Sequence, residues 1–133
     1  MMPVGAWIQP GNGRWINELG YPANTSPQGV YFYELDLDVD LANFTSILLS
    51  LQYSADNSVF IDLIDPNGNV KSLGFTNAAN SFATLFTATS ATTIDFPVSG
   101  HYKLRAKVFN AGSTGTYTGL LIIGTLTADN ICQ

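Results

Sequence analysis

The chain is poor in cysteine, histidine and charged side chains of either sign. Cys132 is the single cysteine among 133 residues, which excludes an internal disulfide and a cysteine-based metal site. The chain has five Lys and Arg residues and ten Asp and Glu residues, so its formal net charge is -5. No basic stripe is available to neutralise phosphates or to lie on anionic lipid. We therefore expect neither a nucleic-acid partner nor a membrane partner.

We also expect no secretory signal and no membrane-spanning helix. The opening MMPVGAWIQPGNGRW has no charged region, continuous apolar region or cleavage site of a secretory signal. The longest apolar run, Leu120 to Ile123, is far shorter than the roughly 18 residues of a membrane-spanning helix. Only 11% of residues are charged, so Ser, Thr, Asn and Gly must cover much of the surface. Such a surface is typical of an assembled or extracellular protein.

Helical periodicity is absent, and alternation with a period of two takes its place. Turn-forming sequences such as SADN, DPNGN, NAAN, PVSG and NAGSTG separate the alternating segments. The pattern predicts an all-β fold, a single antiparallel β-sandwich or jelly roll of about eight strands over residues 30–133. The expected strands are Val30 to Leu41, Thr45 to Tyr53, Val59 to Ile64, Val70 to Thr76, Ser81 to Ala88, Thr92 to Val98, Tyr102 to Asn110 and Thr116 to Thr127.

The first 29 residues differ from the rest, because they hold four of the six prolines and both tryptophans. We expect residues 1–29 to form an irregular N-terminal arm. Its aromatic residues Trp7, Trp15 and Tyr21 either fill the open end of the sandwich or contact a partner. Phe32 is a further interface candidate, since alternation places it among acidic residues, where a core role is least natural.

The segment VFIDLIDPNGNV, followed by SGHYKLRAKVFNAGSTGTYTGLLI, resembles the bacterial pre-peptidase C-terminal domain. SADNSV and the late TGLLI also resemble the β-sandwich domains of bacterial PEP-CTERM proteins, although the sorting tail of that family is missing here. The first resemblance spans roughly Tyr31 to Leu126. It implies a jelly-roll sandwich that accompanies another activity, and its motifs describe architecture more than role.

Catalytic residues are scarce. His101 follows Gly100 at the expected start of a strand, and Cys132 lies beside the C-terminus, so neither suggests a nucleophile with its base. Glu34, Asp36 and Asp38 with Asp40 form one row along a strand, and mutual repulsion favours a solvated face over a glycosidase pair. We expect no enzyme activity and no catalytic residues, with a hydrolase as the least favoured class.

A second charged row consists of Lys103, Arg105 and Lys107. If its strand lies beside the acidic one, cross-strand ion pairs follow, and these affect register or partner choice more than stability. The sequence thus predicts an interface that contains Trp7, Trp15, Tyr21, Phe32, Glu34, Asp36, Lys103 and Arg105.

DPNGN at residues 65–69 has its glycine in the wrong place for a calcium-binding loop, and a hairpin turn explains it better. Calcium bound at a loop end by Asp56, Asn57, Asp62 and Asp65 remains an open alternative. We expect no metal and no cofactor.

The sequence leaves three functions open. The first is a structural protein on the exterior of a virion, a capsid decoration or cement protein that binds the major capsid protein lattice as a homotrimer. The second is a carbohydrate-binding or adhesion module, which would place the protein outside the cell or on its surface. The third is a hydrolase. Small size, scarce charge and the sandwich body favour the virion hypothesis.

Overall fold

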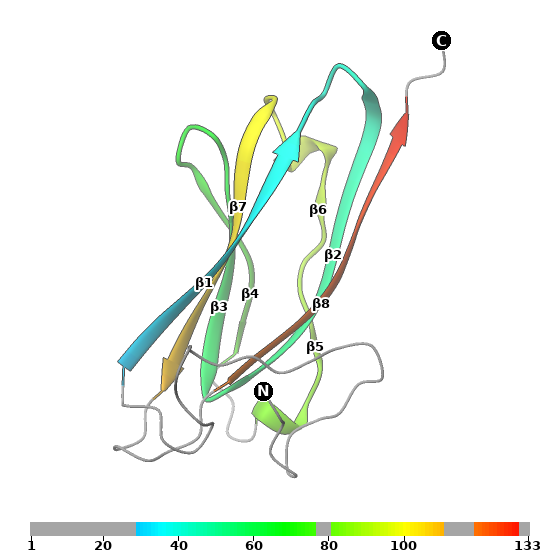
Figure 1. Cartoon of the computed structure of the whole chain (residues 1–133). Helices are drawn as coiled ribbons and strands as arrows, with labels where there is room; N and C mark the ends of the chain where they lie inside the picture. Colours follow the sequence, from blue (N-terminus) through cyan, green and yellow to red (C-terminus); the bar gives the residue numbers. More distant parts are fainter. Residues whose placement is uncertain (1–28, 77–80, 111–118, 131–133) are drawn as a thin grey trace.

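A computed structural model describes residues 29–76, 81–110 and 119–130. The described residues form eight strands and two short 3-10 helices (Figure 1). The strands are β1 (Gly29–Val39), β2 (Phe44–Asp56), β3 (Ser58–Ile64), β4 (Val70–Thr76), β5 (Phe86–Thr87), β6 (Ala91–Thr92), β7 (Gly100–Asn110) and β8 (Gly119–Asn130), and the helices are η1 (Ser81–Ala83) and η2 (Thr93–Asp95).

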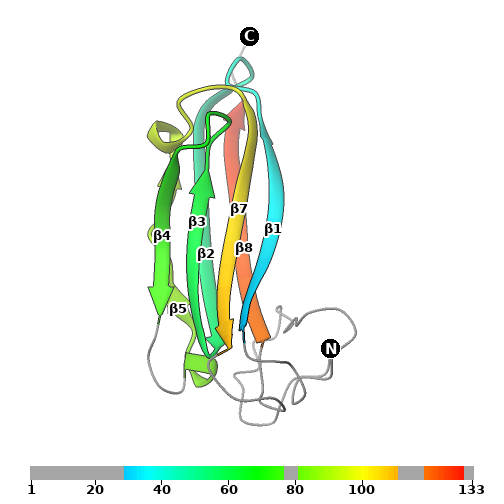
Figure 2. The same cartoon turned by 90° about the vertical axis from the view of Figure 1, so that its left-hand side faces the viewer.

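The strands form two antiparallel sheets that face each other (Figures 1 and 2). The first sheet has the order β1-β7-β3-β4, and the second is built on β2. Strand β8 pairs with one edge of β2, and the short strands β5 and β6 follow each other along the other edge. The prediction of an all-β antiparallel sandwich is confirmed.

The core lies between the sheets and follows from alternation along the central strands. In β3 every second side chain is buried, beginning with Val59, while its neighbours are only half-buried. Strands β2 and β7 add rows of the same kind, so the two inner faces consist almost entirely of aliphatic and tyrosine side chains. The inward residues of these three strands are Ile47, Leu49, Leu51, Tyr53, Ala55, Val59, Ile61, Leu63, Tyr102, Leu104, Ala106 and Val108.

Two aromatic residues close the core at the start of β7. Phe96 and Tyr102 are fully buried, and their rings meet edge to face at 4.9 Å between centroids. The Tyr102 hydroxyl donates a hydrogen bond of 2.7 Å to the carbonyl oxygen of Val98. The buried phenol therefore has a partner, and the bond ties the loop that precedes β7 to the strand itself.

The predicted strands at Ser81 to Ala88 and Thr92 to Val98 are wrong for most of their length. The structure has η1 and the two-residue β5 in the first range, and η2 in the second. In η2 the backbone N–H of Thr92 donates to the Asp95 carboxylate at 2.7 Å, which satisfies the backbone locally as a capping box. A polar side chain thus takes the place of the backbone hydrogen-bond partner that a neighbouring strand would supply. Residues with high β-propensity do not form a strand by propensity alone.

The remaining predicted strands correspond to observed ones, with identical bounds for β4 and shifted ends for the others. Strand β2 continues beyond the predicted end to Asp56, and β8 continues to Asn130. DPNGN is the predicted hairpin turn, because the Asp65 carboxylate accepts hydrogen bonds from the backbone N–H groups of Asn67 and Asn69. Gly68 has φ +87°, a backbone conformation that favours glycine.

The predicted N-terminal arm lies outside the described residues, except that Gly29 is the first residue of β1. Neither helix among the described residues is long and apolar enough to span a membrane.

Candidate functional site

Five of the predicted interface residues lie on one surface, the outer face of the first sheet. Strands β1 and β7 pair so that Glu34 is opposite Arg105 and Asp36 is opposite Lys103. Phe32 is on the same face, one outward position before Glu34. The other three, Trp7, Trp15 and Tyr21, are outside the described residues.

The predicted cross-strand ion pairs are present at Glu34. Its carboxylate accepts a bond of 3.1 Å from the Lys103 ammonium and one of 2.8 Å from Nε of Arg105. These hydrogen bonds, that of Lys103 first, hold the pKa of Glu34 below its ordinary value. Exposed pairs of this kind contribute little to stability. Their main effect is to fix the three side chains in one arrangement on the sheet.

A group of phenylalanine rings lies beside these charges, and we call Phe32, Phe60, Phe75 and Phe109 the aromatic face. Cross-strand pairing puts Phe32 and Phe60 on either side of Lys107, with Phe75 next to Phe60. Phe60 stacks on Phe75 at 4.2 Å between centroids and meets Phe109 edge to face at 5.7 Å. The aromatic face therefore reaches across all four strands of the sheet.

Two cations lie over these rings. The Arg105 guanidinium is 5.7 Å from the centroid of Phe32, and the Lys107 ammonium is 5.1 Å from that of Phe109. Contacts at these distances are favourable cation–π interactions. Phe32 nevertheless remains 57% exposed and Phe75 46% exposed. The outer face thus presents large apolar rings to solvent, held in place by neighbouring charges.

Sequence reasoning found Phe32 but missed the other three members of the aromatic face. Phe60 stands between Val59 and Ile61 in an apolar run, where hydrophobicity does not reveal which side chain points outward. The charged Asp62 on the same strand could have shown that Phe60 points outward, because residues two apart on a strand share a face. The same step of two from Lys107 would have placed Phe109 outward.

Asp62 lies on the outer face of β3, opposite Arg105. Burial raises the pKa of its carboxyl, and the charges of Arg105 and Lys107 only partly offset this effect. A raised pKa means that the charged carboxylate is less favourable in the folded chain than in the unfolded one.

We expect Asp62→Asn to increase the free energy of unfolding slightly at neutral pH, since the variant buries no charge. This advantage should disappear below the ordinary value of 3.8, where the wild-type carboxyl is protonated in both states. Urea denaturation at several pH values measures the difference, and Asp36→Asn on the same face is the control for loss of one negative charge. A wild type more stable than Asp62→Asn at neutral pH would show that pairing with Arg105 outweighs burial.

The other acidic residues are spread along the sandwich. Asp38 pairs with His101 at the opposite end of β1 from Phe32. Asp56 precedes β3 and Asp65 follows it, so the structure does not bring the residues of the calcium alternative together. No group of three His, Cys, Asp or Glu suited to a metal ion occurs among the described residues.

Comparisons with protein-family models, curated proteins and solved structures find no match. The resemblances to the pre-peptidase C-terminal domain and to PEP-CTERM proteins therefore stay predictions.

Proposed function

We propose that this protein is a non-enzymatic structural protein that binds another protein through the aromatic face, and that it decorates the exterior of a virion capsid. The observation that carries the proposal is the exposure of Phe32 and Phe75 on the outer face of the first sheet. Exposed apolar patches of connected residues mark interaction sites, whereas single exposed apolar residues do not.

The chemistry of the aromatic face fits a protein partner. Phenylalanine has no polar group, so the free energy gained on burial of its ring is largest when a partner covers the ring completely. Interfaces commonly have an aromatic centre and a charged rim. Glu34, Lys103 and Arg105 provide such a rim along one side of the rings.

A capsid lattice is the proposed partner because it offers many identical, broad surfaces to a small protein. Scarce charge reduces the desolvation cost when the sides of neighbouring decoration proteins approach one another. The acidic net charge is consistent with a partner other than nucleic acid.

Carbohydrate binding is the second candidate, favoured by the polar groups that border the rings. A sugar ring stacked on Phe32 would have Glu34 and Arg105 within reach of its hydroxyl groups. This candidate predicts binding by isolated glycans with no protein partner.

The test compares two variants that each replace two exposed apolar residues with glutamate. We expect Phe32→Glu with Phe75→Glu to weaken sedimentation with capsids of the virus that encodes the chain by at least about tenfold, because central aromatics dominate interface energies. Val70→Glu with Ile94→Glu adds the same charge outside the aromatic face and should bind like wild type.

Two outcomes would overturn the capsid proposal. One is a wild-type chain that does not sediment with those capsids, or an aromatic-face variant that binds as well as wild type. The other is saturable binding to a glycan array that the aromatic-face variant loses, which would establish the carbohydrate function.

A further inference from the structure

Strand β8 forms one edge of the second sheet. It pairs with β2 from Gly119 to Asn130, and in the described part of the chain no strand pairs with its other edge. Its residues from Gly124 to Asp129 are all exposed. An exposed edge presents backbone N–H and C=O groups in the right order to pair with another strand.

Most of this edge carries no protection against such pairing. No charged residue and no proline occurs from Gly119 to Ala128, and the sequence is rich in Leu, Ile and Thr. Strand β1, the edge of the first sheet on the same side, carries Glu34, Asp36 and Asp38. Proteins usually place charges or proline on long edge strands to prevent unwanted association. The contrast indicates that β8 is covered in the assembled protein.

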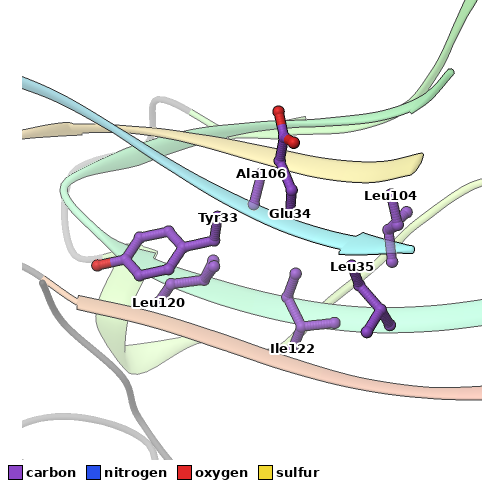
Figure 3. Close-up of a pocket in the computed structure, with 7 residues that line it drawn as sticks. All are labelled: Tyr33, Glu34, Leu35, Leu104, Ala106, Leu120 and Ile122. Atoms are coloured by element: carbon purple, nitrogen blue, oxygen red, sulfur yellow. The ribbon is translucent and has the colours of Figure 1, made fainter.

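The core itself is open between β1 and β8 (Figure 3). A cavity of about 280 Å³ opens there. Leu35 is 58% exposed although it pairs with the buried Leu104, and Leu126 is 45% exposed although it pairs with the buried Leu49. Inward-facing rows of both sheets thus reach solvent at this edge. The lining residues include Tyr33, Leu35, Leu104, Ala106, Leu120 and Ile122.

We propose that a second copy of the chain pairs with β8 antiparallel across a two-fold axis, so that the second sheet continues from one copy into the other and the protein is a dimer instead of the homotrimer expected from the sequence. In a two-fold contact both chains contribute the same surface. The strand must therefore be able to pair with an antiparallel copy of itself. With the axis at Leu126, the two leucines meet each other, and each Thr125 faces Thr127 of the second copy.

Charge selects β8 over β1 for this contact. In the same arrangement Asp129 faces Ile123 of the second copy, so no two acids are opposed. A two-fold contact through β1 centred on Asp36 would place Asp36 beside itself and Glu34 beside Asp38, which is destabilising. The dimer contact uses no residue of the aromatic face and does not rest on the proposed capsid function.

The first test is the native mass of the full-length protein at micromolar concentration, by light scattering after size exclusion. We expect twice the chain mass of 14.3 kDa. Thr125→Lys with Thr127→Lys places four ammonium groups around the axis and should return the mass to that of one chain. Ser72→Lys with Thr87→Lys, at exposed positions on β4 and β5, is the matched control and should remain dimeric.

Hydrogen–deuterium exchange of the wild-type protein needs no variant and locates the contact. The backbone amides of Gly124 to Ala128 should be protected in the dimer and exchange faster on dilution, while those of β1 should not change. A wild-type monomer or trimer, a dimer that survives the Thr125 and Thr127 substitutions in a folded chain, or unchanged exchange at β8 would each overturn the proposal. Capsid binding by the monomeric variant reports separately on the function proposed above.

Discussion

Phe96→Ala is expected to lower the free energy of unfolding by about 3 to 5 kcal/mol, the usual cost of emptying a buried phenylalanine site. The Phe96 side chain is completely buried against Tyr102, which belongs to the regular strand β7. Because that strand pairs on both sides, it cannot move to fill the space. The cavity should therefore persist in the variant.

A domain of this size is commonly stable by about 5 to 15 kcal/mol, so the loss would be a large share of the total. Urea denaturation followed by circular dichroism measures it. Ile94→Ala, in the same segment but 88% exposed, is the control and should change stability by less than about 0.5 kcal/mol. A loss below about 1 kcal/mol for Phe96→Ala would mean that the loop before β7 does not close the core.

Gly74→Val should destabilise the sandwich by about 1 to 3 kcal/mol, as overpacking of a core commonly does. Gly74 lies on β4 and faces inward, because it pairs with the buried Ile61. A Cβ atom at this position would be 2.8 Å from the ring of Tyr53 on the opposite sheet. The ring would have to move, and its hydroxyl would lose the 3.1 Å hydrogen bond to the carbonyl oxygen of Phe75.

The comparison variant is Ser72→Val, which adds a similar side chain at an exposed position of the same strand. Thermal unfolding of both variants separates strand propensity from crowding against Tyr53. Equal melting temperatures for the two would contradict the close approach of glycine and tyrosine between the sheets.

Sequence reasoning predicted the long strands well because each buries one face. In β3 every inward position holds a large apolar residue, and β7 follows the same step of two with Ala106 and the polar Asn110 as its exceptions. The same reasoning failed for most of residues 81–98, where Thr92 and Asp95 are joined by local hydrogen bonds around a helical turn. Residue type indicated extended structure there, and side-chain bonding to the backbone prevailed.

The candidate site was predicted only in part. The acidic row on β1 and the basic row on β7 predicted the pairs at Glu34 only on the condition that the two strands are neighbours, which the resemblance to the pre-peptidase C-terminal domain implied. The aromatic face could not be predicted without knowing which strands are neighbours. Phe32 and Phe75 belong to the two outer strands of the sheet, and β7 and β3 lie between them. Sheet order is a long-range property that one sequence does not encode in any local pattern.

The shortness of β5 and β6 limits how far such molecules can associate. Together they cover only four positions along the second edge of β2. A continuous sheet made through β8 would end in these two-residue strands at both extremities, and a further copy would find almost no ladder to join. Association would therefore stop at two chains. If both edges of the second sheet were long and unprotected like β8, chains could add at either end and form fibres.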